Sequence, residues 1–452
     1  MTRSRVIGAI LAALVAGGAA TAFVIAWRPA FAAIDPPQPQ SFDAARVRRG
    51  RELAAIGNCS TCHTSVGGKD FAGGVPVPTP FGTIYSSNIT PDPETGIGRW
   101  SEEAFRRAMR MGVDREGRHL YPTFPYDHFT HVSDEDDNAL YAYLMTREPV
   151  RAPQRENQLS FPLNQRFVIA GWKLLFLHRG TYRPDATKSA EWNRGAYLVE
   201  GLAHCGACHT PRNALGAERA SAAFAGGNVD NWQAYAINAQ SPSPVPWDTE
   251  ALYAYLRNGW HPDHGTARGP MAAVVSNLSA VSANDVRAIA TYVADMSGQP
   301  AQSRKVRGEA ALAQAKSTPA VETPASPGAA IYAAACATCH ESGRPPPYGG
   351  INLGLSTAIS GSDPRNLANI VLSGVAPVEG ESSPIMPGFA STMNDAQIAV
   401  LLHYLRSRFS DQPAWSDIER TIAEARRTQT ASLNTGAGAR PASPDQAQRD
   451  KR

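Results

Sequence analysis

The chain has 452 residues, of which 18% are charged, and its formal net charge at pH 7 is +3. This length allows about three domains of ordinary size, at roughly 100 to 150 residues each. The small net charge and the lack of a basic run argue against nucleic-acid binding.

The N-terminus carries Arg3 and Arg5 and then Val6 to Trp27, a stretch of 22 residues without a charged side chain. A bilayer-spanning helix needs about 20 apolar residues, and arginines before it hold its start on the cytoplasmic side. Ala30-Phe31-Ala32 resembles a signal-peptidase site, which keeps a cleaved signal peptide open as the alternative. Residues 1–34 are therefore expected to be a signal-anchor or a signal peptide, with the remainder exported.

In each of three later regions a helical run carries a glycine eight to ten residues before a cysteine: Gly50, Gly195 and Gly328. Glycine inside a helix costs about 1 kcal/mol relative to alanine. Its recurrence at the same place predicts that another helix approaches closely there.

The pattern C-x-x-C-H follows each glycine, and its three copies use all six cysteines of the chain. Thiols three residues apart lie about one helical turn apart, so both can bond the two vinyl groups on one edge of a porphyrin. The next histidine is then held below the iron as its proximal ligand. The residues predicted to hold three covalent haem c groups are Cys59, Cys62 and His63, Cys205, Cys208 and His209, and Cys336, Cys339 and His340.

Zinc sites and redox-active dithiols also use C-x-x-C pairs. A structural zinc site pairs two of them over roughly 12 to 20 residues, whereas the first cysteines of successive copies are 146 and 131 residues apart. Haem attachment is the preferred interpretation, and zinc or dithiol chemistry remains the alternative.

Two further helices are predicted after each motif. The first should run from Ser101 to Gly112, from Asp248 to Gly259 and from Asp363 to Gly374. The second starts with [ST]-x-x-[DE] and contains a tyrosine, namely Ser133–Asp136 with Tyr143, Ser282–Asp285 with Tyr292, and Thr392–Asp395 with Tyr404.

This order of elements resembles a small class I cytochrome c domain. The expected fold class is all-α, with three such domains in tandem behind the N-terminal segment. The predicted parts are domains at 42–148, 188–298 and 328–410, a connector at 149–187 whose apolar run Phe167–Leu177 packs between the first two domains, a flexible linker at 299–327, and a polar, disordered tail at 411–452.

A second axial ligand of a cytochrome c iron is usually methionine. Met271 lies 62 residues after His209 and Met386 lies 46 residues after His340, both in proline-containing loops before the last helix. We expect both to be metal ligands, and a core position for each methionine is the alternative.

The first domain breaks this pattern, because the residue 61 positions after His63 is Phe124, which cannot bind iron. His128 in the same loop is the preferred ligand. Met109 and Met111 are alternatives better explained by packing, and an open five-coordinate haem is the third possibility. Four other histidines are expected to be solvated loop residues: His119, His131, His261 and His264. His204 is expected to form a local hydrogen bond.

Five stretches together resemble the three-haem cytochrome c subunit of membrane-bound bacterial dehydrogenases. They are Ala72–Gly74, Asn88–Pro91, Gly96–Trp100, Leu120–Pro122 and Cys208–Asn213. This family includes the subunits of alcohol, gluconate and sorbitol dehydrogenases and of molybdenum-containing aldehyde, nicotinate and isoquinoline oxidoreductases. Phe124 with His128 looks more like the molybdenum branch, since the alcohol dehydrogenase subunits carry methionine at that position.

The resemblance implies an electron-transfer subunit with no catalytic residues of its own. Its partners would be a dehydrogenase catalytic subunit, with a molybdenum hydroxylase favoured over a PQQ or flavin subunit, and a quinone or a downstream cytochrome or oxidase. It would work at the periplasmic side of the bacterial inner membrane. The alternative is a haem enzyme whose open first iron reduces peroxide or binds a small gas, and Phe124 keeps this alternative open.

Overall fold

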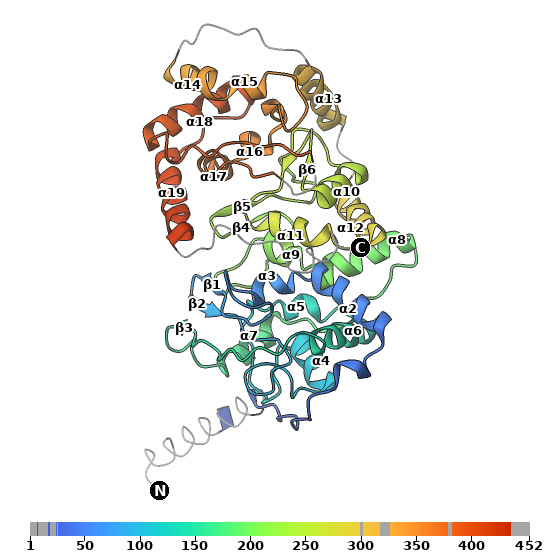
Figure 1. Ribbon diagram of the computed structural model, residues 1–452. Helices are drawn as coiled ribbons and strands as arrows, with labels where there is room; N and C mark the ends of the chain where they lie inside the picture. Colours follow the sequence, from blue (N-terminus) through green and yellow to red (C-terminus); the bar gives the residue numbers. More distant parts are fainter. Residues whose placement is uncertain are drawn as a thin grey trace. The chain divides into compact units, whose positions relative to one another are not determined.

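The computed structural model describes residues 26–298, 302–316, 326–377 and 382–434, with Ile7, Gly17, Gly18 and Val24 before them. The chain divides into two compact units, residues 1–183 and 184–452 (Figure 1). The first unit contains one C-x-x-C-H motif and the second unit contains two. Below, the first, second and third motif segments are residues 42–148, 188–298 and 326–434.

The first unit combines helices with a three-stranded antiparallel sheet of order β1-β2-β3. Its elements are η1 (Pro39–Ser41), α2 (Ala44–Ile56), α3 (Cys59–His63), β1 (Pro76–Thr79), β2 (Gly82–Tyr85), α4 (Glu102–Met111), α5 (Tyr126–Phe129), α6 (Asp134–Met145), β3 (Gln158–Leu159) and α7 (Val168–Phe176).

The second unit is longer and has two small two-stranded sheets, β4-β5 and β6-β7. Its elements are α8 (Ala190–Tyr197), η2 (Leu198–Leu202), α9 (Gly206–His209), η3 (Ala220–Ala222), β4 (Gly227–Val229), β5 (Trp232–Ala234), α10 (Thr249–Asn258), β6 (Trp260–His261), β7 (Gly265–Thr266), α11 (Pro270–Leu278), α12 (Ala283–Met296), α13 (Gln302–Lys316), α14 (Pro327–Ala335), α15 (Ala337–His340), η4 (Leu353–Leu355), α16 (Thr357–Ser360), α17 (Arg365–Ser373), α18 (Asp395–Phe409) and α19 (Ile418–Asn434).

Helices are the main regular structure of both units, and the short strands are a departure from the all-α prediction. Strands β4 and β5 are joined by Asp230 and Asn231, which have φ angles of 47° and 61°. Two left-handed residues in a two-residue loop match the twist of an antiparallel pair, and Asp and Asn tolerate that conformation. The Asp-Asn pair was therefore the hairpin signal in the sequence, and the prediction did not use it.

The close helix approach predicted from the recurring glycines is confirmed. A Cβ atom on Gly50, Gly195 or Gly328 would lie 2.7 to 2.8 Å from the Cβ atom of Tyr143, Tyr292 or Tyr404, respectively, and would overlap a backbone carbonyl. Helix α2 thus packs against α6, α8 against α12, and α14 against α18. Only glycine permits this separation, so its cost in helix propensity is offset by packing.

The helices predicted in the middle of each segment are also confirmed. Ser101 and Asp248 cap the starts of α4 and α10 by accepting hydrogen bonds from Ala104 and Ala251. Glycines with positive φ end these helices and α17, at Gly112, Gly259 and Gly374, with φ angles of 58°, 80° and 71°. Each glycine turns the chain towards the loop that holds the predicted second axial ligand.

The second helix predicted after each motif, α6, α12 or α18, begins where predicted in two of three cases. Ser133 caps α6 and Ser282 caps α12 through hydrogen bonds from the third residue beyond. Helix α18 instead begins after Asn394, which forms a capping box with Gln397. The prediction of Thr392 as the start was wrong by two residues, because asparagine caps as well as threonine does.

In the first two segments, an arginine directly before the recurring glycine joins the glycine-containing helix to the helix that packs against it. Arg194 binds Asp285 through two hydrogen bonds of 2.7 and 3.0 Å. Arg49 binds Asp136 in the same way at 3.2 and 3.3 Å. Each carboxylate lies in the first turn of its helix, where the helix dipole favours negative charge.

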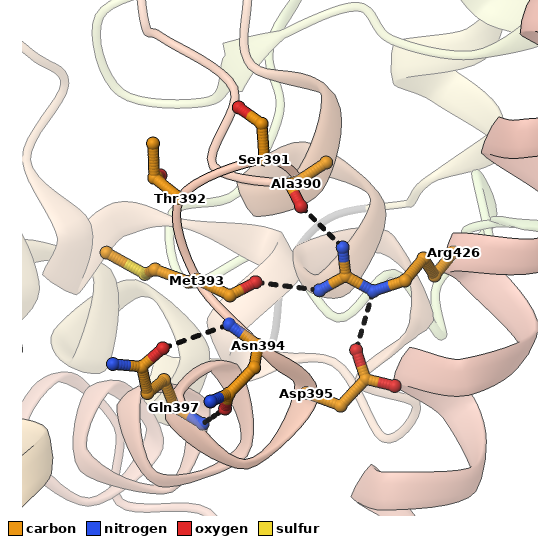
Figure 2. A pocket seen from close by; sticks show the side chains of 8 residues that line it. All are labelled: Ala390, Ser391, Thr392, Met393, Asn394, Asp395, Gln397 and Arg426. Carbon is orange, nitrogen blue, oxygen red and sulfur yellow. Dashed lines mark hydrogen bonds and ion pairs between the residues drawn. The ribbon is translucent and has the colours of Figure 1, made fainter.

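The third segment has proline at the position of that arginine, and the C-terminal region provides the arginine instead. Arg426 of α19 binds Asp395 at 2.6 Å and the carbonyls of Ala390 and Met393 at 2.6 and 2.8 Å. Figure 2 shows this network around the capping box of α18. The hollow in Figure 2 is lined by residues of this cap, and by none of the motif residues.

Helix α19 lies in the tail that the sequence predicted to be disordered from residue 411 onward. Ile418, Ile422 and Ala425 are buried in the core of the third segment together with Trp415, whose indole donates to the carbonyl of Gly361 at 2.9 Å. The prediction of disorder was wrong here because it relied on the low overall hydrophobic content of the tail. The few apolar residues of α19 lie on one face of the helix. Residues 435–452 lie outside the described part of the chain.

The predicted linker also contains regular structure. Helix α13 occupies Gln302–Lys316, and its Gly308 is buried beside Pro246, where a Cβ would lie 2.8 Å from the proline Cδ. Residues 299–301 and 317–325 lie outside the described residues.

The apolar run of the connector forms α7, which packs on the first unit through Ile169, Ala170 and Lys173. Leu174 and Leu175 on its other face are exposed. The buried Lys173 ammonium donates to the carbonyls of Met111 and Gly112 at the end of α4. These hydrogen bonds to the last carbonyls of α4 dock α7 onto α4.

Lys173 should make the stability of the first unit depend on pH. Burial lowers its pKa from the ordinary 10.5 to about 7. Between these values the unfolded chain binds the additional proton, so the free energy of unfolding rises with pH by up to about 1.4 kcal/mol per unit. Lys173→Met should remove this rise, as measured by thermal melting between pH 7 and pH 10. The control Lys69→Met changes an exposed lysine of the same unit. If Lys173→Met keeps the wild-type pH dependence, Lys173 is not the group that causes it.

Among the described residues no helix is both long and apolar enough to cross a membrane. The predicted span, Val6–Trp27, lies almost entirely outside them. The chain after it is held by the first unit. Phe31 donates its N–H to the carbonyl of Arg115 at 2.8 Å, and the Arg107 guanidinium lies 4.0 Å from the Phe31 ring centre.

Candidate functional site

Each C-x-x-C-H motif forms a short helix after the glycine-containing helix, directly in the first and third segments and after η2 in the second. In the first two segments the residue before the first cysteine is left-handed, Asn58 at φ 53° and His204 at φ 40°. This residue ends one helix and redirects the chain into α3 or α9. His204 also contacts the carbonyl of Leu202 at 2.8 Å through Nδ1, which confirms its predicted local role.

The three motif histidines share one hydrogen-bonding arrangement. Nδ1 of His63 lies 2.7 Å from the carbonyl oxygen of Ser87, Nδ1 of His209 lies 2.6 Å from that of Tyr235, and Nδ1 of His340 lies 2.8 Å from that of Ile351. A carbonyl oxygen only accepts hydrogen bonds, so Nδ1 carries the proton in each ring. The lone pair of each imidazole is therefore on Nε2, the tautomer that a metal ligand requires.

Burial lowers the pKa of His63, His209 and His340 below the ordinary value of 6.5. The hydrogen bond to a carbonyl opposes this shift, but desolvation is the larger effect in each case. The three rings are neutral at pH 7 and can coordinate a metal ion without first losing a proton.

The cysteines differ from the reactive thiols of dithiol oxidoreductases. Burial raises the pKa of Cys59 and Cys205 to about 12 and that of Cys336 to about 11. Reactive C-x-x-C thiols have lowered pKa values. The first cysteine of each motif therefore lacks the lowered pKa of a thiol that takes part in thiol–disulfide exchange.

The carbonyls that hold the first two histidines are positioned by β-hairpins. Ser87 follows β2 and Tyr235 follows β5, whereas Ile351 lies in a loop. A glycine N–H also binds the histidine carbonyl in these two segments, Gly73 to His63 and Gly226 to His209, both at 2.7 Å. The sequence prediction missed these carbonyl acceptors because a backbone carbonyl has no residue-type signature.

The motif residues fit a covalently held haem by the chemistry of the donor set. Each motif presents two thiols and one neutral imidazole with the correct tautomer on a single helix. The backbone also approaches the third imidazole closely, because a Cβ on Gly350 would lie 2.6 Å from Nδ1 of His340. The same donors and the same hydrogen bond occur three times in one chain.

Met271 and Phe124 occupy equivalent places in the second and first segments. After the glycine that ends α10, Ala267 donates to the carbonyl of Gly259 at 2.8 Å, and Met271 follows four residues later. In the first segment Leu120 donates to the carbonyl of Gly112 at 2.7 Å, and Phe124 follows four residues later. Met271 is partly buried at the start of α11.

Met386 pairs with Val375 in a short antiparallel bridge just after α17. Its two backbone hydrogen bonds to Val375 measure 2.8 and 3.0 Å. The side chain packs against the core of the third segment, as Cys336 does. The bridge therefore brings the predicted ligand to the same core as the third motif.

His128 lies one helical turn after Phe124, in α5, and is partly buried. Met109 is buried in α4, as the packing interpretation predicted, and Met111 is partly buried at its end. The second axial ligand of the first site remains a prediction.

Two of the other histidines are not solvated as predicted. His119 is 3% exposed, with Nε2 2.8 Å from the carbonyl of Ala26 and Nδ1 3.1 Å from the Lys173 ammonium. His264 is 7% exposed and stacks on Trp247 with ring centres 3.5 Å apart. Aromatic stacking and buried hydrogen bonds, neither visible as a sequence pattern, explain both positions.

Comparison with known proteins places these features in context. Residues 47–148 and 325–409 match the family model "Cytochrome c". The chain is 37% identical over 402 residues to the fructose dehydrogenase cytochrome subunit of Gluconobacter japonicus, covering 84% of this chain and 82% of that protein. It is 35% identical over 417 residues to the gluconate 2-dehydrogenase cytochrome c subunit of Pantoea cypripedii, covering 87% and 92%.

A further relative is much longer than this chain. Identity to a nicotinate dehydrogenase subunit of Pseudomonas putida is 47% over 411 residues, covering 90% of this chain. The matched region spans 34% of the length of that protein.

Proposed function

Because the chain belongs to the family of cytochrome c subunits of dehydrogenases, we propose that it is the electron-transfer subunit of such a complex and carries three covalent haem c groups. The observation that supports this most strongly is the repeated Nδ1 hydrogen bond of His63, His209 and His340. When bound, haem supplies a one-electron iron couple. The chain's own residues attach it, orient the proximal imidazole and shield both from water.

We propose the three motif segments as three cytochrome c domains, each with one haem. The nine residues of the C-x-x-C-H motifs attach the groups, and Met271 and Met386 are the second axial ligands of the second and third sites. His128 is the proposed ligand of the first. The shared packing of Met386 and Cys336 against one core supports the third assignment.

The electron donor in this proposal is a separate catalytic subunit. Relatives are named as cytochrome subunits of fructose and gluconate dehydrogenases and as a subunit of nicotinate dehydrogenase. The higher identity to the nicotinate dehydrogenase subunit and the Phe124–His128 pair favour a molybdenum hydroxylase over a PQQ or flavin enzyme. Electrons would pass to quinone or to a downstream cytochrome or oxidase.

We place the protein at the periplasmic side of the inner membrane with its N-terminal segment retained. The 22 uncharged residues after Arg5 support an anchor. Cleavage after Ala32 would remove Phe31, which contacts Arg107 and Arg115 in the first unit. This packing supports retention over a cleaved signal peptide.

Mass spectrometry of the exported, denatured chain tests the proposal. The wild-type chain should be heavier than the polypeptide by three haem groups, and Cys205→Ser/Cys208→Ser should carry two. Ala207→Ser, a change inside the same motif, should keep three. A wild-type chain without haem mass would refute the proposal.

The alternative of an open first haem rests on Phe124, which occupies the place of Met271. Carbon monoxide added to the reduced protein distinguishes the two. A shift of about one third of the haem absorbance would indicate an open iron, and no shift would indicate a chain restricted to electron transfer.

A further inference from the structure

A hydrogen-bonded contact joins the second and third motif segments within the second unit. Gln233 of β5 donates its N–H to Oδ1 of Asn366 at 2.8 Å, and Nδ2 of Asn366 donates to the carbonyl of Gln233 at 2.9 Å. Nδ2 of Asn369 donates to the carbonyl of Asn231 at 2.8 Å. We call Asn366 and Asn369, with their three bonds, the amide clamp. Figure 1 shows β5 beside α17, the helix that carries both asparagines.

The clamp satisfies backbone groups that the hairpin leaves unpaired. Val229 pairs with Trp232 next to the two-residue turn, so the next pair, Asn228 and Gln233, points its backbone groups away from the partner strand. The Asn366 side chain supplies the donor and the acceptor that a third strand would supply. Both asparagines are buried, at 6% and 8% exposure. Leaving the N–H and carbonyl of Gln233 buried without hydrogen-bond partners would cost free energy. The Asn366 side chain therefore stabilises this contact by binding both groups.

Other contacts lie beside the clamp. Nη2 of Arg268 donates to the carbonyl of Gly374, the residue that ends α17, at 2.7 Å. Gly361 lies against the Tyr235 ring, where a Cβ would be 3.3 Å from Cε1. The two segments are therefore joined at both ends of α17.

The clamp is connected through short chain segments to elements of both predicted haem sites. The carbonyl of Tyr235, two residues after Gln233, accepts the hydrogen bond from His209. At the other end of α17, Val375 follows Gly374 and pairs with Met386. Hydrogen bonds to a metal-bound imidazole set its orientation and basicity.

We propose that the amide clamp holds the second and third sites as one rigid body and positions the Tyr235 carbonyl against His209. Asn366 and Asn369 are thus positioning residues for electron transfer between these two sites. This inference rests on the proposed function. The predicted flexible linker at 299–327 therefore does not separate these two segments, because α17 is bonded to β5.

The test uses the full-length, haem-loaded protein and the variants Asn366→Leu and Asn366→Asp. Leucine removes both bonds of Asn366, while aspartate keeps the acceptor and places an oxygen against the Gln233 carbonyl. The control is Asn238→Leu, because Asn238 bonds the carbonyl of Ala223 within the second segment. Hydrogen exchange of residues 231–235 is the first measurement, and redox titration with the rate of electron transfer between haems is the second.

Both clamp variants should lose amide protection at residues 231–235 by about tenfold or more. They should also shift the midpoint potential of one haem and slow transfer between two of the three, while the control changes neither. Unchanged protection in a folded variant would overturn the proposal. Lost protection with unchanged potential and rate would also overturn it, because the clamp would then be only structural.

Asn369→Leu serves if the Asn366 variants fail to fold. It removes a single bond and should give the same changes to a smaller extent, and wild-type values would contradict the proposal. Hydrogen exchange reports the clamp whether or not haem is attached. A chain with an intact clamp and no haem would therefore refute the proposed function and leave the contact standing.

Discussion

Gly195→Ala is expected to lower the free energy of unfolding of the second unit by about 3 kcal/mol, the upper end of the cost of overpacking. The added Cβ would lie 2.8 Å from the Cβ of Tyr292 and would overlap the carbonyl of Ala288. These neighbours are the backbone of α12 and the atom next to it, so no side-chain rotation relieves the clash. The gain of about 1 kcal/mol in helix propensity is too small to compensate.

Gly171→Ala is the matched control. Gly171 lies inside α7, and a Cβ there would have no heavy atom within 4 Å. The same substitution should therefore leave stability unchanged or raise it by about 0.5 to 1 kcal/mol. Thermal melting measures both variants, and amide exchange is followed in α8 and α12 for Gly195→Ala and in α7 for Gly171→Ala. Equal stability of the two would show that α8 and α12 do not approach as closely as described.

Met271 and Phe124 occupy equivalent places in the second and first segments. Replacing each residue by the other type should move the potentials of two haems in opposite directions. Met271→Phe removes the proposed thioether ligand of the second site. Phe124→Met offers a thioether to the first site in place of the proposed ligand His128. Methionine ligation raises the potential, and axial ligands set haem potentials over a range of about 0.8 V. Changes on the order of tenths of a volt are therefore expected, downward in Met271→Phe and upward in Phe124→Met.

Redox titration followed by absorbance measures these changes. The control is Met109→Leu. Met109 is a buried residue of α4, and a volume-conserving exchange there should leave the potentials unchanged. A Met271→Phe protein with wild-type potentials would show that Met271 is a packing residue. An unchanged first potential in Phe124→Met would show that the added thioether does not displace His128, the proposed ligand of the first site.

Local spacing accounts for the parts of the structure that were predicted well. Gly50, Gly195 and Gly328 implied a close helix partner, because glycine is unfavourable in a helix unless a Cβ would clash. Ser101, Asp248 and Gly112 marked helix ends through their own hydrogen bonds and backbone angles. These signals lie within a few residues along the chain, so no knowledge of the fold was needed.

Other elements were misjudged because distant residues stabilise them. Helix α19 has few apolar residues, and its place depends on the core around Trp415 and on the bonds of Arg426 to α18. His119 and His264 are buried because Lys173 and Trp247 lie beside them. Arg426 lies 31 residues from Asp395, His119 lies 54 residues from Lys173, and His264 lies 17 residues from Trp247.

The sequence by itself determined the three C-x-x-C-H motifs, the recurring glycines Gly50, Gly195 and Gly328, and the presence of Phe124 where the second segment has methionine. These are covalent spacings and residue identities, which folding does not change. Only the tertiary structure decided which carbonyls hold His63, His209 and His340, and that Asn366 joins β5 to α17. Backbone carbonyls are the same in every residue, so the choice among them depends on how the chain is folded and not on its letters.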